Sequence, residues 1–183
     1  MIQELYRVLN FFLVIVIGLL ISSFQSVLLK IPVFAWLELD LLLLVIVYLS
    51  LHRQFLETAA LIMILGRIAE IHSAAPVGII TICYLAVHIA ILLTREMILV
   101  ATTFSTIILC VACGLVWKIT FLFFAQRYGF FDNAWKSTLE YSLPYLLSLG
   151  VFARPMFEMM RKLDHISRVE KDSEARNMTG EEF

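Results

Sequence analysis

Six long apolar runs, joined by connections of only two to nine residues, constrain the fold of this chain more than any other feature. A helix rises 1.5 Å per residue, so about 20 predominantly apolar residues cross a membrane. Charges and turn residues delimit the runs as 8–29, 34–51, 55–72, 76–94, 97–124 and 134–153. We therefore predict an all-α polytopic membrane protein, built as a compact bundle of six transmembrane helices.

The composition supports this class. Hydrophobic residues make up 61% of the 183 residues and charged residues only 16%, and the mean hydropathy is +0.91. An ordinary soluble domain is about 25% charged. This hydropathy leads us to expect lipid around the chain. The formal net charge of -1 provides no basic surface, so we expect no nucleic-acid partner.

The charged residues concentrate in the last 30 positions, which divides the chain into a transmembrane domain, 1–153, and a C-terminal part, 154–183. Arg154 and Pro155 are expected to end the sixth helix. Beyond them, apolar residues recur every three or four positions, a pattern typical of a short amphipathic helix: Met156, Met160, Leu163, Ile166 and Val169. This helix is expected to lie on the inner leaflet, to bind a cytoplasmic partner or simply to be solvated. An acidic tail follows from residue 172.

Orientation follows from the basic residues at the helix ends, which gather on the cytoplasmic side. One side collects Arg7, Arg53, Arg95, Arg154, Arg161, Lys162 and Arg168. The other collects Lys30, Lys118, Arg127 and Lys136. We predict that both termini are cytoplasmic, and that Lys118 extends outward from its helix to reach the interface.

Three cysteines, Cys83, Cys110 and Cys113, lie within apolar runs. A redox or zinc site would need charged or histidine neighbours that stabilise the thiolate or bind the metal, and the nearby sequence has neither. We interpret the cysteines as small packing residues and expect no cofactor. The sequence also lacks HExxH and Gly-x-Ser-x-Gly motifs, so we expect no enzyme.

Charged residues nevertheless occur within the second and third runs. Arg53 lies at the connection between the two runs. Asp40 comes 13 residues before Arg53, and Arg67 comes 14 residues after it. Both are therefore about 20 Å from the turn, at the same depth. Glu38 and Glu70 lie slightly farther out, so we predict one charged layer near the outer face, formed by Glu38, Asp40, Arg67 and Glu70.

An unpaired charge at the bilayer centre costs at least about 2.5 to 3.5 kcal/mol, so these groups should pair. Glu70 can pair with Arg67 within one helix, three residues away, or Asp40 can pair with Arg67 across the hairpin and fix its register. A proton or ion pathway is the third interpretation. Only His88 extends the layer toward the inner half of the membrane, so we favour a structural or partner-recognition role over transport.

The stretch "GRIAEIHSAAPVG", residues 66–78, resembles the segment "GLLQDLLSGAPLG" typical of the rod shape-determining protein MreD family. The matching positions are Gly66, Glu70, Ser73, Pro76 and Gly78, and Tyr84 follows where the family often has tyrosine. "ELD", which ends at Asp40, resembles the family's Pro-Asp but lacks the proline. Glu70 replaces the usual aspartate, and Arg67 stands where the family is usually apolar. Agreement in motif covers residues 38–84.

This resemblance implies a non-enzymatic subunit of the bacterial inner membrane. Such a subunit belongs to the cell-elongation complex, maintains cell shape and lateral wall synthesis, and binds MreC. Its indirect partners are the MreB filament and the glycan polymerase and transpeptidase that build peptidoglycan. The alternative is the substrate-binding membrane subunit of a vitamin or small-molecule importer. Such subunits couple through an AxxxA face on the first helix, where this chain offers only Gly18 and Ser22.

Overall fold

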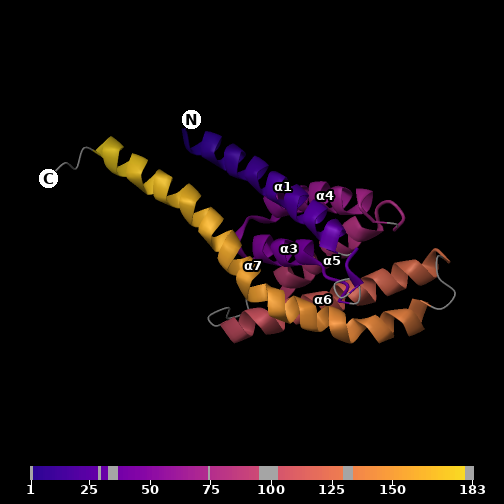
Figure 1. Ribbon diagram of the computed structural model, residues 1–183. Helices are drawn as coiled ribbons and strands as arrows, with labels where there is room; N and C mark the ends of the chain where they lie inside the picture. Colours follow the sequence, from indigo (N-terminus) through magenta and orange to yellow (C-terminus); the bar gives the residue numbers. More distant parts are fainter. Residues whose placement is uncertain are drawn as a thin grey trace.

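A computed structural model describes residues 2–28, 30–32, 37–73, 75–94, 103–129 and 134–179. Within these ranges the chain is all-helical and has no strand. The helices are α1 (Ile2–Leu28), α3 (Leu41–His52), α4 (Phe55–Ile71), α5 (Ile79–Thr94), α6 (Thr103–Arg127) and α7 (Ala134–Thr179). The beginning of the fifth predicted run, residues 97–102, lies outside the described residues. The labelled N- and C-termini lie at the same end of the molecule (Figure 1).

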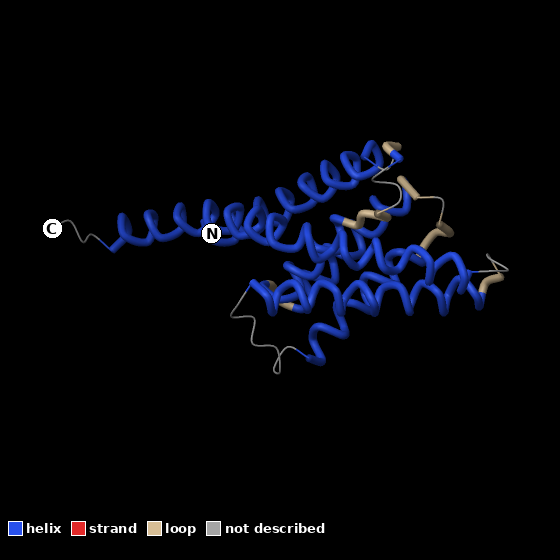
Figure 2. Tube along the Cα trace, turned by 60° about the horizontal axis from the view of Figure 1, so that its bottom comes forward, coloured by secondary structure: helices blue, strands red, loops and turns tan. Residues whose placement is uncertain are grey.

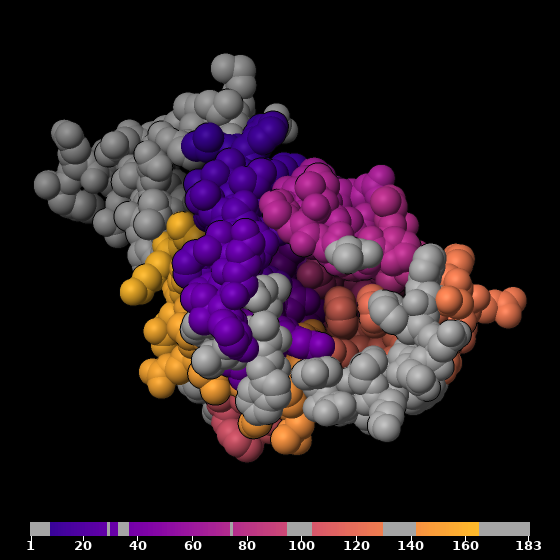
Figure 3. All heavy atoms as spheres, turned by 45° about the vertical axis from the view of Figure 1, so that its right-hand side comes forward, coloured from indigo at the N-terminus to yellow at the C-terminus, as the bar shows by residue number. Residues whose placement is uncertain are grey.

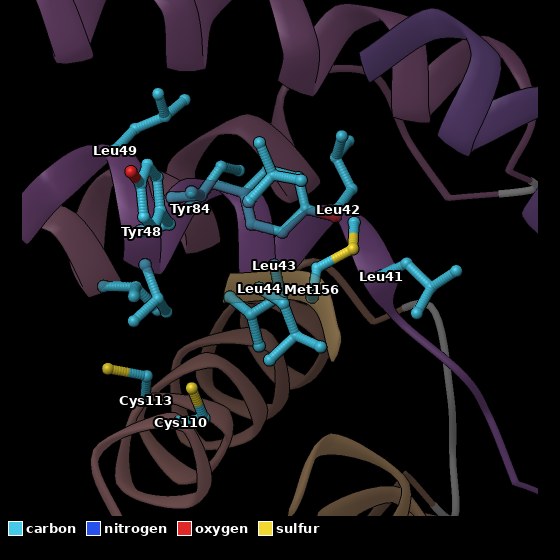
Figure 4. Packing of buried hydrophobic residues seen from close by; sticks show 14 of the residues in the cluster. Leu41, Leu42, Leu43, Leu44, Tyr48, Leu49, Tyr84, Cys110, Cys113 and Met156 are labelled. Carbon is cyan, nitrogen blue, oxygen red and sulfur yellow. The ribbon is translucent and has the colours of Figure 1, made fainter. Parts of the chain in front are cut away.

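Helix α3 forms the centre of the bundle, and it packs against each of the other five helices (Figure 1). Every residue from Leu41 to Ser50 is buried. The segment "LLLLVIVYL" is apolar on all sides, and a helix of that kind must be enclosed by others or by lipid. Figure 4 shows the enclosing side chains, with Met156 of α7 near Leu43 and Leu44, and Cys110 and Cys113 of α6 on one side of the cluster.

The predicted start of this helix, at residue 34, is wrong. The helix begins at Leu41, because the carboxylate of Asp40 accepts a hydrogen bond from the Leu43 backbone N–H at 3.0 Å and caps it. Residues 37–40, which precede it, form a turn and then an irregular segment. Its 12 residues span about 18 Å, so α3 alone is shorter than the apolar core of a bilayer.

The outer faces of the surrounding helices are apolar. Exposed large hydrophobic residues occur on α1, α4, α5, α6 and α7, among them Phe12, Leu56, Leu93, Phe123 and Val151. In the space-filling view, α1 and α4 form adjoining parts of this exterior (Figure 3). Two helical stretches, Val8–Leu28 and Phe104–Arg127, are long and apolar enough to cross a membrane. Only 17% and 28% of their apolar windows are buried, so most of each faces outward.

The predicted end of the sixth helix, at residue 153, is wrong, because α7 extends much farther. It continues without a break through Pro144 and Pro155 to Thr179 and projects beyond the bundle (Figure 2). Pro155 removes one backbone hydrogen bond. The buried stripe nevertheless runs through it at helical spacing: Tyr145, Leu149, Ala153, Met156 and Met160. Packing on both sides of the proline therefore holds the helix together.

The first apolar residues of the predicted amphipathic helix pack on the bundle itself. Met156 and Met160 are buried in the central cluster, and Leu163 packs against it. The Phe157 ring lies edge-on to Tyr48 of α3, with centroids 5.4 Å apart. The side chains of Ile166 and Val169 lie outside the described residues. Residues 172–179, expected as an acidic tail, are helical.

Adjacent methionines on α7 test this packing. Met160 is 1% exposed and Met159 is 37% exposed. We expect Met160→Ala to lower the free energy of unfolding in mixed micelles by about 2 to 5 kcal/mol, because it leaves a cavity beside α3. Met159→Ala is the matched control and should cost less than about 1 kcal/mol. Equal effects would mean that the helix beyond Pro155 does not pack in the bundle.

Candidate functional site

The four residues of the predicted charged layer occupy the end of the bundle where α3 begins and α4 ends. They do not form one continuous ionic layer. Three separate polar contacts replace it, centred on Asp40, on Glu38 and on Glu70. Each contact joins two helices, or the segment before α3 to a helix.

Asp40 is buried between α3 and α5. Besides capping α3, its two carboxylate oxygens accept from the Tyr84 hydroxyl at 3.2 and 3.3 Å. Tyr84, noted in the sequence only as a frequent family residue, is thus the partner that Asp40 uses. One carboxylate therefore caps the start of α3 and bonds that start to α5.

Glu38 pairs with Lys118 of α6. Lys118 does not extend to the interface as predicted, because its side chain is only 10% exposed and its Nζ lies 4.6 Å from the centroid of the Tyr145 ring. The ammonium is favourably placed over that aromatic face. Glu38 has a φ of 43°, in the left-handed region that a residue with a side chain rarely adopts.

Glu70 joins α4 to α5. One carboxylate oxygen accepts from the Thr81 backbone N–H at 3.1 Å and from the Thr81 hydroxyl at 2.8 Å. The other accepts from Arg67 at 2.9 Å. A negative charge on the free N–H groups at the start of α5 is favourable. The Glu70 side chain is 4% exposed and that of Arg67 is 57% exposed, so the acid is buried and the base is at the surface.

The remaining positions of the family-like segment shape the same turn. A Cβ on residue 66 would lie 2.9 Å from the Thr81 Cα, so Gly66 lets the two helices approach closely enough for Glu70 to reach. Gly78 has a φ of 96°, which favours glycine. The Ser73 hydroxyl accepts from the Ala75 N–H at 3.1 Å. The Pro76 carbonyl accepts from the Ile79 N–H at 3.3 Å, at the start of α5.

Of the two pairings open for Arg67, the structure has the one within the helix. Asp40 and Arg67, both described, form no ion pair with each other. Asp40 faces Tyr84 of α5 and its own helix terminus, whereas Arg67 lies on the exposed side of α4. The hypothesis that a charge pair fixes the register of the α3–α4 hairpin is therefore wrong.

Sequence reasoning missed a second polar cluster at the opposite end of α3. Arg53 donates to Glu57 at 2.6 Å, to Asn10 of α1 at 2.7 Å and to Asp164 of α7 at 3.5 Å. The Tyr48 hydroxyl donates to Asp164 at 2.8 Å. The spacing of Arg53 and Glu57 was a readable signal for an i, i+4 pair. The two distant partners left no such signal.

His88 does not continue an ionic path. Its Nδ1 lies 2.9 Å from the Ser50 hydroxyl, and its ring stacks on Phe55 with centroids 5.4 Å apart. Its Nε2 is buried and has no hydrogen-bond partner among the residues that the structure describes. Within the described residues, no group of three or more His, Cys, Asp or Glu side chains is placed to hold a metal ion.

Searches with protein-family models, among curated proteins and among solved structures found no match to this chain.

The contact between Glu70 and Thr81 predicts energetic coupling. In a double-mutant cycle of Glu70→Ala and Thr81→Val, the free energies of unfolding should be non-additive by about 0.5 to 3 kcal/mol, because the Thr81 hydroxyl donates to the Glu70 carboxylate and valine removes that donor. The cycle of Asp40→Asn and Arg67→Gln is the control. It should be additive within about 0.5 kcal/mol. Coupling in the second cycle alone would contradict this result and support an ion pair between Asp40 and Arg67.

The close approach at Gly66 makes a second prediction. Gly66→Ala should lower the free energy of unfolding by about 1 to 3 kcal/mol, because the added methyl meets the Thr81 backbone. Gly150→Ala is the matched control, since its Cβ would lie 3.6 Å from the nearest side-chain atom, Ile107 Cγ2, which is an ordinary van der Waals distance. It should raise stability by up to about 1 kcal/mol through helix propensity. Both are measured by chemical unfolding in micelles.

Proposed function

We propose that this chain is a non-catalytic subunit of the bacterial inner membrane that acts in cell elongation, in the manner of the MreD family, and binds MreC. The observation that carries the proposal is that all five positions of the family-like segment meet in one structural unit. In this unit Glu70 bonds the start of α5, Gly66 permits the approach, and Ser73, Pro76 and Gly78 shape the turn. The resemblance therefore rests on positions that work together.

The apolar exterior supports insertion of the whole bundle in the membrane. Besides the two long apolar helices, α4, α5 and the first half of α7 carry exposed hydrophobic residues. We infer six crossings with both termini in the cytoplasm. The common position of the two ends agrees with an even number of crossings (Figure 1). Enclosure by five helices allows the short α3 to serve as one of them, because its ends need not meet lipid.

The polar groups of the interior support a structural role. Asp40 caps α3, Glu70 bonds the first turn of α5, and Arg53 joins α1, α4 and α7. These bonds hold helices in place. A scaffold that presents one rigid surface to MreC needs such bonds, and it needs no reactive group.

The position of Gly18 and Ser22 favours this function over that of an importer subunit. A Cβ on residue 18 would lie 2.2 Å from Leu65 Cδ2, and the Ser22 hydroxyl lies 3.4 Å from Nδ1 of His72. The small-residue face of α1 is thus occupied by α4 of the same chain. An importer subunit would need that face for its coupling partner.

Affinity purification of the tagged chain from its native membrane tests the proposal. We expect MreC to co-purify, together with the glycan polymerase and transpeptidase at lower yield. An unrelated polytopic protein with the same tag is the control. Recovery of an ATPase module in place of MreC would overturn the proposal in favour of the importer.

A further inference from the structure

The ion pair between Glu38 and Lys118 is unequally buried. The Lys118 side chain is 10% exposed and that of Glu38 is 38% exposed. The pair therefore lies at an opening, with its cation inside and its carboxylate outside. Figure 3 faces this end of the bundle and shows a hollow between the segment that precedes α3, the end of α4 and the α6 helix.

Two hydrogen-bonding groups lie beside Lys118 without a partner among the described residues. The Tyr145 hydroxyl and the Trp117 Nε1 are buried and form no hydrogen bond within that part of the chain. Tyr145 is 2% exposed. The centroids of the two rings lie 6.0 Å apart, and Lys118 Nζ lies 4.6 Å from the first and 6.0 Å from the second. A buried donor left unsatisfied is destabilising, so two in one place require an explanation.

Lys118 connects these groups to the carboxylates at the same end of the bundle, because its ammonium pairs with Glu38 and lies over the Tyr145 ring. The carboxylate of Asp40 is already used by Leu43 and Tyr84. Glu38 is held toward Lys118 by a backbone conformation that is unfavourable for glutamate. Strain of this kind is typical of ligand sites.

We propose that the Glu38–Lys118 pair, with the unpartnered Tyr145 hydroxyl and Trp117 N–H beside it, is a binding site for a zwitterion. The ligand inserts into the ion pair. Its anionic oxygens accept hydrogen bonds from Lys118, Trp117 and Tyr145, and its ammonium pairs with Glu38. Both orphan donors are then satisfied, and the Glu38 carboxylate stays at the mouth of the site.

The charge balance selects the ligand class. A simple anion on Lys118 would leave the Glu38 carboxylate unpaired, and a simple cation on Glu38 would leave the Lys118 ammonium unpaired in a largely buried place. Such uncompensated charges are strongly unfavourable. A zwitterion supplies one partner to each. A phosphoethanolamine group has this chemistry, either as a lipid headgroup or as a free molecule. The site does not depend on the proposed function in cell elongation.

Thermal unfolding of the purified full chain in a zwitterion-free detergent tests the site with three probes. These are dihexanoyl phosphatidylethanolamine, free phosphoethanolamine and dihexanoyl phosphatidylglycerol. At about 100 times its Kd, the first should raise the Tm by roughly 5 °C. A shift with free phosphoethanolamine as well would identify the headgroup chemistry alone as sufficient. A shift with the lipid only would identify the lipid as the source. An equal shift with phosphatidylglycerol, or no shift at all, would overturn the proposal.

Variants assign the shift to the site. Tyr145→Phe and Trp117→Phe remove one donor each and keep an aromatic ring, and neither removes a hydrogen bond that the described residues form without ligand. Each should at least halve the shift relative to its own baseline. Tyr48→Phe is the matched control, because it breaks a hydroxyl bond to Asp164 at the other end of the bundle. It should lower the baseline Tm and keep the full shift. Full shifts in both site variants would place the ligand elsewhere.

Discussion

The enclosure of α3 is the constraint on which the rest of this structure depends. A helix without a polar face cannot lie at a boundary with water, and α3 has none between Leu41 and Leu49. Five helices surround it, so the faces that they turn toward α3 must be apolar. The outer faces of these helices then decide whether the bundle is surrounded by water or by lipid. They are apolar as well, which agrees with the membrane location that we propose.

Enclosure also determines where polar groups are needed. The two ends of a buried helix expose backbone groups that neither lipid nor apolar side chains can satisfy. Asp40 answers this need at the start of α3. At the other end, Arg53 donates its own backbone N–H to Leu49 and its side chain to α1, α4 and α7. The charged residues of this apolar chain thus connect helices that have little hydrophobic reason to associate within lipid.

Much of this arrangement was readable from the sequence because it is local. The apolar runs gave the helices, and the short segment from Gly66 to Gly78 gave a turn whose members lie close in the chain. The errors concern distant contacts. Arg67 pairs with Glu70, one helical turn away, whereas Asp40 accepts a hydrogen bond from Tyr84, which lies 44 residues later in the chain. Helix α7 continues past Pro155 because Met156 and Met160 are buried in the central cluster; the apolar spacing was visible in the sequence, but the surface that buries it was not.

The burial of Lys118 shows what such distant contacts imply for function. A lysine near the end of an apolar helix normally extends to the interface, since its long side chain can carry the charge to water. Here the ammonium stays inside, over Tyr145 and against a strained Glu38. Elsewhere in the bundle, Asp40, Glu70 and Arg53 are each held by two or more hydrogen bonds, as expected of groups that serve stability alone. Within the described part of the chain, Lys118 has one hydrogen-bond partner, Glu38, and two buried donors without a partner lie beside it. That contrast separates a site with capacity for a ligand from the parts of the structure that are already complete.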